Sequence, residues 1–418
     1  MKVAAFIANR IAFSQPSGQT GKQKSFSRFI IKLSVVATII SVAVMIITIS
    51  LANGFQQTIS QKIFSFWGHI RIQEKQPDKV IISEETPIEA NTHLIAEIKQ
   101  NPEVKSVHSF ATKYAILKTK EDIEGVLIKG LDSSYDFNHL QQFIVEGRPI
   151  RFADSAYSKE IMISSYTAGR MNLKVNDSLI MYFMRAGENP RPRKISIAGI
   201  YRTGIEKYDN LIALGDLKLI QRLNNWEPNQ VGGYEVFLKD YKKIDTLNNE
   251  IYNIGDFPAT WDAISVKRIS PDIFDWLGLM DMNRNVLIIF MVVVAVINLV
   301  TCLIILVLER IRMIGILKAL GATDWTVQQI FLRQTLIITV TGIITGTAIA
   351  LGLLWLQQAT GFIKLQEEAY YLSTAAVDIV WWQVLVIGAG TFLISLLILM
   401  VPSLLVKKVQ PVKAIQFR

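Results

Sequence analysis

The sequence is poor in residues that build cross-linked or metal-dependent sites. It has a single cysteine, Cys302, so no disulfide can form within the chain. We interpret Cys302 as a small apolar packing residue. The four histidines, His69, His93, His108 and His139, lack the spacing of metal ligands, and we expect each on the surface of a soluble domain. The sequence therefore gives little support for a membrane enzyme.

A nucleotide-binding loop is also missing. The segment Gly18–Gln23 contains Gly21 followed by Lys22, but a P-loop needs a further glycine five positions before Gly21 and Ser or Thr after Lys22. Pro16 and Gln23 occupy those positions. We therefore expect no ATPase and no bound cofactor in this chain.

Long uncharged stretches, in contrast, are abundant. Half of the residues are hydrophobic and the mean hydropathy is +0.32. The excess lies in four stretches, each reaching the roughly 20 residues that a helix needs to cross the hydrocarbon core. They are Leu33–Ser60, Val286–Leu308, Gln334–Ala359 and Ile379–Val406. We predict four transmembrane helices. The alternative for the first, a signal peptide cleaved near Ser50–Ala52, would need a shorter leader and a shorter apolar run.

The distribution of charge predicts the orientation. The first 52 residues contain six Lys or Arg and no acidic residue, whereas acidic and basic residues nearly balance between 53 and 285. The surplus of +9 thus flanks the membrane spans and does not indicate a nucleic-acid partner. By the positive-inside rule, both termini and the 309–333 loop are cytoplasmic. The acidic 357–378 loop and the domain between the first two spans then lie outside.

The segment between the first two spans alternates strand-like and helix-like patterns, which predicts a mixed α+β domain, with two lobes divided near 130–145 as one arrangement. Predicted strands are 70–73, 104–119, 125–129, 160–164, 178–184, 194–201 and 233–238, and predicted helices are 88–100, 165–172, 215–224 and 241–254. Apolar residues at helical spacing also follow the first span and precede the second, and these predict two stalk helices.

The predicted fold is therefore a membrane protein with four transmembrane α-helices and a large α+β extracytoplasmic domain inserted between helices 1 and 2. The predicted segments are a cytoplasmic amphipathic leader at 1–29, a span at 30–53, a stalk helix at 54–69, the α+β domain at 70–269, a stalk helix at 270–285, a span at 286–308, a cytoplasmic coupling helix and loop at 309–333, a span at 334–357, a short outer loop at 358–378, a span at 379–406 and a cytoplasmic tail at 407–418.

A short helix is predicted in the cytoplasmic loop after the second span, and Thr323 is the expected N-cap of the helix that follows it. Ile314, Leu317 and Leu320 would form a small apolar ridge on the short helix, and Gly315 and Gly321 would allow close approach or a sharp turn. Such a ridge would suit a groove on another protein.

This stretch resembles the coupling segment of the FtsX/MacB/Lol superfamily of ABC permeases, written E-x-x-R-x-I-[GA]-I-L-[KR]-x-[LI]-G-A. The tail Val409–Ala414 resembles the closing P-[VA]-x-A motif of the same superfamily. The resemblance implies that the segment contacts an ATPase through Glu309, Arg310, Arg312, Ile314, Gly315, Ile316, Leu317, Lys318, Leu320, Gly321 and Ala322.

Three further segments resemble the lipoprotein-releasing (Lol) permeases. Phe6–Arg10 is similar to their F-I-A-x-R start, and Asn53–Gln56 is similar to the N-G-F motif at the outer end of their first span. The segment Met184–Arg193 lies where these permeases place a hairpin that recruits a periplasmic carrier, although an ordinary Pro-rich surface loop is the alternative. The carrier-binding residues implied by the resemblance are Glu188, Asn189, Pro190, Arg191 and Pro192.

The resemblance implies a permease subunit in the inner membrane of a Gram-negative-type bacterium, extracting lipoproteins from the outer leaflet. Its implied partners are a cytoplasmic ABC ATPase dimer that binds the ATP, a second permease copy or paralogue, the lipoprotein substrate, a periplasmic LolA-like carrier and membrane lipid. The alternatives are an FtsX-like regulator of a periplasmic hydrolase and a MacB-like efflux permease.

A lipid-bearing substrate would suit an apolar groove that holds its acyl chains, and we place this groove near the outer ends of the first two spans. We hypothesise that it is lined by Met45, Ile49, Phe55, Phe290 and Met291, with ordinary helix or lipid packing as the alternative. The pair Gly342 and Gly346 in the third span is interpreted as a helix-packing motif.

Overall fold

The computed structural model describes residues 21–76, 83–153, 157–183, 190–309 and 311–398. Four of its helices are long and apolar enough to cross a membrane, within Ile31–Trp67, Pro271–Cys302, Asp324–Thr360 and Trp381–Ile398. The prediction of four transmembrane helices, with a sheet-rich domain between the first and the second, is confirmed.

The chain divides into two compact units. We call them the membrane unit, which contains the residues up to Gln57, Leu277–Lys364 and the residues from Thr374, and the outer unit, which contains Thr58–Trp276 and Leu365–Ser373.

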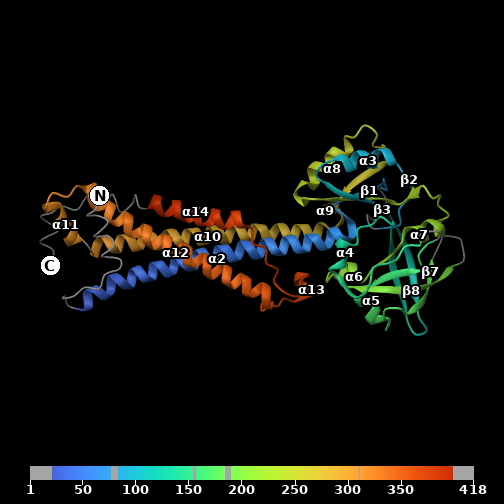
Figure 1. The fold of residues 1–418 in the computed structure, drawn as a ribbon, viewed down its shortest axis with the longest axis horizontal. Helices are drawn as coiled ribbons and strands as arrows, with labels where there is room; N and C mark the ends of the chain where they lie inside the picture. Colours follow the sequence, from blue (N-terminus) through green and yellow to red (C-terminus); the bar gives the residue numbers. More distant parts are fainter. Residues whose placement is uncertain (1–20, 77–82, 154–156, 184–189, 310, 399–418) are drawn as a thin grey trace. The chain divides into compact units, whose positions relative to one another are not determined.

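The membrane unit is helical (Figure 1). Its helices are α2 (Gly21–Trp67), α10 (Pro271–Glu309), α11 (Ile311–Ala319), α12 (Asp324–Thr360) and α14 (Trp381–Ile398). The predicted first span and first stalk thus lie in one helix, α2, and the second stalk and second span lie in α10. Residues 21–29 of the predicted leader also belong to α2, whereas residues 1–20 and 399–418 lie outside the described residues.

Small and branched residues hold α2, α12 and α14 together. Met45 and Ile46 of α2 pack in one cluster with Leu354 of α12 and Val384 of α14. A Cβ atom at Gly342 would lie 2.7 Å from the Thr38 side chain, and one at Gly346 would lie 2.8 Å from the Ile39 carbonyl oxygen. The interpretation of these two glycines as a packing motif is therefore confirmed. Cys302 is buried against Ile31 and Ile305, as expected of a packing residue.

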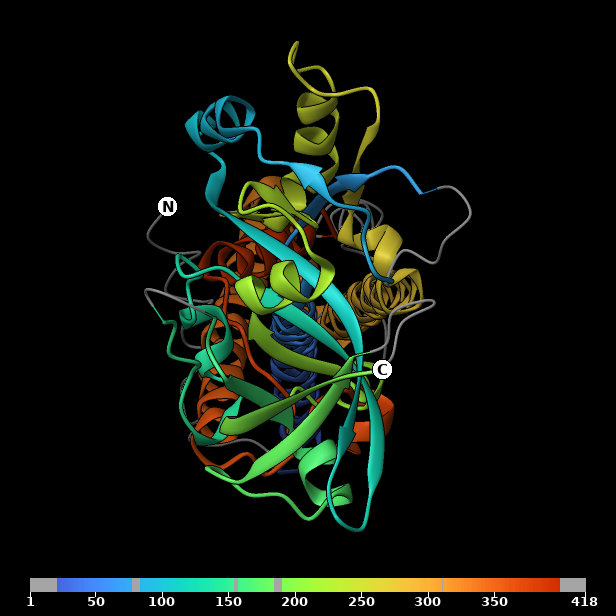
Figure 2. The same ribbon diagram turned by 90° about the vertical axis from the view of Figure 1, so that its right-hand side faces the viewer.

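The outer unit is built on a ten-stranded sheet with the order β12-β1-β11-β3-β4-β9-β6-β8-β5, in which β7 pairs with β3 and β8. Figure 2 looks at this unit and shows the twist of the sheet. Its strands are β1 (Ile70–Glu74), β3 (Val104–Lys118), β4 (Ile123–Leu131), β5 (Ile144–Gly147), β6 (Glu160–Ser164), β7 (Ser178–Phe183), β8 (Arg191–Tyr201), β9 (Ile212–Asp216), β11 (Gly233–Leu238) and β12 (Trp261–Ser265), and β2 (Ile88–Glu89) pairs separately with β10 (Gln230–Val231).

Short helices connect and cover these strands. They are α3 (Thr92–Gln100), α4 (Asn138–Gln141), α5 (Ser165–Arg170), α6 (Glu206–Asp209), α7 (Leu217–Asn224), η1 (Tyr241–Lys243), α8 (Ile244–Tyr252), α9 (Val266–Ile269) and α13 (Glu367–Tyr370). The amphipathic α7 is typical: Asp216 caps its N-terminus, and Leu219, Ile220 and Leu223 are buried.

Every predicted strand is present, but β2, β5, β9, β10 and β12 were not predicted, and β2 occupies the start of the predicted helix 88–100, which begins at Thr92. The residues of β9 and β12 are short runs that carry an aspartate, so they lack the long alternation that identified the other strands. The single sheet contains strands from both sides of residues 130–145, so the domain is not divided there into two separate sheets.

The expected surface position of the histidines is wrong for two of them. His69 is buried, stacks on the Phe64 ring at 4.0 Å between centroids, and accepts a hydrogen bond from the Leu238 amide. His108 is buried against Tyr135. His93 is exposed beside Asp256. Within the described ranges, no group of three or more His, Cys, Asp or Glu residues could hold a metal ion.

Candidate functional site

The segment after α10 forms a short helix, as its sequence predicts. Helix α11 ends in a Schellman motif, in which the Gly321 amide donates to the Lys318 carbonyl at 3.0 Å and the Ala322 amide donates to the Leu317 carbonyl at 2.9 Å. Gly321 has φ +90, a conformation that strains any residue with a Cβ. The Thr323 side chain then caps α12, as expected. The glycine therefore sets the sharp turn between α11 and α12.

Only part of the predicted apolar ridge on α11 is exposed. Ile314 and Gly315 are buried, because Ile314 packs against Val307 of α10 and Val327 of α12. Ile314 therefore holds α11 in place and is not part of an exposed ridge. Leu317 is half-buried, whereas Ile316 is 47% exposed and Leu320 is 80% exposed.

Other residues of the segment frame this exposed surface. Trp325 at the start of α12, which was not predicted, is 61% exposed. Arg312 is exposed, and Lys318 forms an ion pair with Asp324 at 2.8 Å. Arg310 lies outside the described residues, and nothing is described of the Glu309 side chain. The exposed large apolar residues of this segment are thus Ile316 of α11, Leu320 directly after α11, and Trp325 of α12.

The Asn53–Gln56 motif joins α2 to the other elements at its end of the membrane unit. Asn53 donates to the Gln383 side chain of α14 at 2.5 Å, and Gln56 donates to Asp281 of α10 at 3.0 Å. A Cβ atom at Gly54 would lie 2.4 Å from the Ala376 carbonyl oxygen, so only glycine fits there. The motif therefore connects α2 to α10, to α14 and to the loop before α14, through contacts of Asn53, Gly54 and Gln56.

The last turn of α2 is fixed to the sheet of the outer unit. The Gly68 amide donates to the Phe64 carbonyl at 2.8 Å, and the Tyr135 hydroxyl donates to the Ser65 carbonyl at 2.9 Å. Lys129 of β4 donates to the carbonyl of Phe66. These carbonyls would otherwise lack partners at a helix C-terminus, and Lys129 also places a positive charge at the negative end of the helix dipole.

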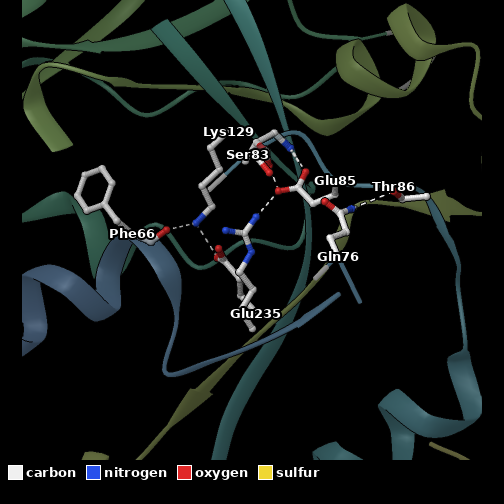
Figure 3. Close-up of polar contacts among 9 residues, drawn as sticks. Phe66, Gln76, Ser83, Glu85, Thr86, Lys129 and Glu235 are labelled. Carbon is white, nitrogen blue, oxygen red and sulfur yellow. Dashed lines mark hydrogen bonds and ion pairs between the residues drawn. The ribbon is translucent and has the colours of Figure 1, made fainter. Parts of the chain in front are cut away.

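Lys129 belongs to a buried group of four charges, shown in Figure 3. It pairs with Glu235 of β11 at 2.6 Å, and Arg71 of β1 lies opposite Glu235 in the sheet and pairs with Glu85. All four side chains are at most 1% exposed. Because all four are enclosed, each depends on its partner to stay charged.

The electrostatics of this group follow from burial. Burial lowers the pKa of Lys129, and the nearby Glu235 carboxylate opposes that shift. Burial raises the pKa of Glu85, opposed by Arg71 and by hydrogen bonds from Thr112. The Arg71 guanidinium lies 4.1 Å from the centroid of the Phe110 ring, a cation–π geometry. The group ties β1, β4 and β11 to the end of α2, and sequence reasoning missed it, because charged residues in strands suggest solvent exposure.

The predicted carrier segment lies at a hairpin. Strands β7 and β8 are antiparallel neighbours, with Phe183 opposite Arg191 and Tyr182 opposite Pro192. Arg191 and Pro192 therefore belong to β8, which begins three residues earlier than predicted. Pro190 and Pro192 are exposed and Arg191 is half-buried, whereas Glu188 and Asn189 lie outside the described residues.

The five predicted acyl-contact residues do not form one exposed groove. Met45 is buried in the cluster that joins α2 to α12 and α14, so its predicted lipid contact is not possible in this conformation. Ile49, Phe55 and Met291 are half-buried. Phe290 is 62% exposed and lies on a stripe of exposed apolar residues along one face of α10, which also contains Val286, Ile289, Val293 and Ile297.

Comparison with known protein families agrees with this architecture. The family model for the FtsX-like permease C-terminal region matches residues 285–411. The family model for the MacB-like periplasmic core domain matches residues 33–254, which is more than half of the chain. The protein belongs to this family. As a family member with four spans, it is an integral, multi-pass membrane protein.

Individual relatives match over nearly the whole chain. The "Lipoprotein-releasing system transmembrane protein LolE" of Haemophilus influenzae is 24% identical, covering 95% of this chain and 97% of the relative. The "Lipoprotein-releasing system transmembrane protein LolC" of the same organism is also 24% identical, and the match covers 94% of each chain. Among solved structures, the periplasmic region of MacB from Actinobacillus actinomycetemcomitans is 11% identical and covers 49% of this chain and 91% of its own, with a TM-score of 0.33.

Proposed function

We propose that this protein is the permease subunit of an ABC-type mechanotransmission complex in the inner membrane of a Gram-negative-type bacterium. It would extract lipoproteins from the outer leaflet and pass them to a periplasmic LolA-like carrier. The observation that carries the proposal is the similarity, over nearly the full length of each chain, to two transmembrane proteins of lipoprotein-releasing systems.

The proposed ATPase contact is the exposed part of α11. A separate cytoplasmic ABC ATPase dimer would bind the ATP, and both termini of this chain would lie on the same side of the membrane as that dimer. Ile316 and Leu320 provide exposed apolar surface for the contact. The buried Ile314 anchors α11 to α10 and α12. A helix anchored in this way can transmit a movement of the ATPase to α10 and α12.

The force would reach the outer unit through α2 and α10. The last turn of α2 is held by Tyr135 and Lys129, and the strand that follows it, β1, pairs with β12, the strand that precedes α9 and α10. Ile70 and Ser265 face each other in this pair. The two helices therefore connect to neighbouring strands of one sheet, so that a change in their spacing would act directly on that sheet.

The cargo and the second permease copy or paralogue would use apolar helix faces. Besides the α10 stripe, α2 exposes Leu33, Val36, Ile40 and Val44 along one face. In a membrane these faces meet lipid, acyl chains or another permease. The exposed Pro190 and Pro192 at the β7–β8 hairpin support the proposed carrier contact, although the residues at its tip lie outside the described ranges.

The proposal is tested by reconstituting the permease with its ATPase in phospholipid vesicles loaded with a triacylated lipoprotein and with the same protein lacking its acyl chains. We expect ATP-dependent transfer of the acylated form to a soluble carrier and no transfer of the unacylated form. Active ATP hydrolysis without transfer would contradict lipoprotein release and would favour the FtsX-like regulator. Export of the unacylated form would instead favour the MacB-like efflux permease.

A further inference from the structure

The loop between α12 and α14, residues 361–380, is an ordered structure at its base. Lys364 and Thr374 form an isolated β-bridge, and two backbone hydrogen bonds flank it, from Leu365 to Ser373 at 2.9 Å and from Ala375 to Ile363 at 3.0 Å. The base is also held to the helices. Gln357 of α12 bonds to the backbone of residues 363 and 375, and the Asp378 amide donates to the Ser50 carbonyl of α2.

The tip of this loop, Leu365–Ser373, belongs to the outer unit although its base belongs to the membrane unit. Lys62, on the part of α2 within the outer unit, donates to the Tyr371 carbonyl oxygen at 2.6 Å. The Tyr371 ring lies edge-on to Trp276 of α10, with 5.8 Å between centroids. Arg202, which follows β8, forms an ion pair with Glu367. The tip thus contacts three elements that are distant from it in sequence.

The outer unit is shaped to receive Glu367. A Cβ atom at Gly204 would lie 2.4 Å from a Glu367 carboxylate oxygen, which would have to shift, and Gly204 has φ +74, so a residue with a side chain would also strain the backbone here. The turn at Gly204 is held by the buried Asp209 carboxylate, which accepts hydrogen bonds from the amides of Thr203 and Gly204.

The loop tip in turn adopts a conformation that needs support. Tyr371 has φ 57, which is left-handed and unfavourable for an aromatic residue. Such a conformation persists only where surrounding contacts compensate for it. Tyr371 caps the C-terminus of α13, where its amide donates to the Glu367 carbonyl at 2.8 Å, and the hydrogen bond from Lys62 and the contact with Trp276 add to this support. Tip and receiving surface therefore fit each other.

We propose that residues 365–373 act as a strap that fastens the third and fourth spans to the outer unit, with Lys62, Arg202 and Glu367 as its positioning residues. This inference rests on the proposed function and extends it. Helix α11 lies between α10 and α12 in the chain, so a push on α11 would reach the outer unit through α10 and, by way of α12 and the strap, through Lys62 and Arg202. The outer unit would then respond to movements of all four spans, and not only of the two whose helices continue into it.

The strap is tested by charge reversal in the full permease–ATPase complex in phospholipid vesicles. Glu367→Arg and Arg202→Glu are each expected to lower lipoprotein release per ATP hydrolysed by about fivefold, the order expected for loss of one ion pair, with basal hydrolysis unchanged. The double variant should restore most of the release, because it re-forms the pair with its signs exchanged. Lys364→Glu, which reverses an exposed charge at the base of the same loop, is the matched control and should behave as wild type.

A second measurement separates the strap from the proposed function. Hydrogen exchange of the Tyr371 amide, which donates to the Glu367 carbonyl at 2.8 Å, reports whether the tip is fastened. Lys62→Met should accelerate this exchange about tenfold or more, because it leaves the Tyr371 carbonyl without its cationic donor. Equal exchange in wild type and Lys62→Met would overturn the strap even if lipoprotein release is observed. Normal release by both single charge reversals, or failure of the double variant to recover, would also overturn it. If wild type releases no lipoprotein, the proposed function fails, and the exchange result still decides the strap.

Discussion

Lys129 of β4 donates a hydrogen bond to the carbonyl of Phe66, the penultimate residue of α2. The same ammonium group pairs with Glu235 at 2.6 Å. One buried cation thus joins the end of a long helix to two strands of the outer unit.

Replacement of this cation should be strongly destabilising. In Lys129→Met the Glu235 carboxylate stays buried without its partner, and the expected loss of stability is about 3–5 kcal/mol. Chemical denaturation of the detergent-solubilised protein, followed by Trp fluorescence, measures it. Lys105→Met, at an exposed position of β3, is the matched control and should change stability by less than about 0.5 kcal/mol. Equal stability of the two variants would show that the charge group does not hold the joint.

Two residues of the segment around α11 should have different roles, Leu320 in binding the ATPase and Ile314 in packing. Leu320→Asp, at the exposed apolar residue directly after α11, should abolish co-purification of the ATPase and leave stability nearly unchanged. Ile314→Ala should instead lower stability by about 2–4 kcal/mol, because it opens a cavity between α10, α11 and α12. Pull-down yield and thermal denaturation of each variant measure the two effects. A Leu320→Asp variant that retains the ATPase would argue against this surface.

The glycine of the Asn53–Gln56 motif should not tolerate even a methyl group. In Gly54→Ala the new carbon would overlap the Ala376 carbonyl, and we expect a loss of about 1–3 kcal/mol, as for other overpacked sites. Gly352→Ala in α12 is the control, because nothing lies within 4 Å of the added atom, and it should be neutral or stabilising by up to about 1 kcal/mol. Thermal denaturation of both variants in detergent gives the comparison. Similar melting temperatures would refute the close approach.

The ion pair between Arg148 and Glu160 should make stability depend on pH in one direction. The two side chains form a bidentate pair at 2.8 and 2.6 Å, and the hydrogen bonds from Arg148 hold the pKa of Glu160 below its ordinary value of 4.5. A depressed carboxyl pKa contributes stability that is present above the ordinary value and is lost as pH falls through the lowered one. Wild type should therefore exceed Glu160→Gln in stability at pH 7, and the difference should shrink below pH 4.5. A difference that stays constant between pH 7 and pH 3 would contradict this assignment.

The sequence was sufficient for the features that depend on local pattern. Uncharged length identified four spans, alternation identified most strands, and the glycine and threonine of the α11–α12 turn lie where their spacing predicts. Features that depend on distant partners were not predictable. Ile314 and Ile316 look alike in sequence, and only the positions of Val307 and Val327 decide that Ile314 is the buried one.

Buried polar residues were the main source of error. His69, Arg71 and Lys129 suggest exposed positions by residue type, yet each is buried by elements far away in the chain. The same holds for the loop between α12 and α14, which a span prediction treats as a short connection. Its contacts with Lys62 and Arg202 come from segments about 165 to 309 residues away in sequence.

The most direct test of the account is a site-specific crosslink from α11 to the ATPase. In a Cys302→Ser background, Leu320→Cys in inverted membrane vesicles should form an adduct with the ATPase, whereas Ile314→Cys, at the buried position, should form none. An adduct at Leu320 alone is the predicted result. Labelling of Leu320→Cys by an impermeant thiol reagent from the outer side of the membrane, with no ATPase adduct, would contradict the account.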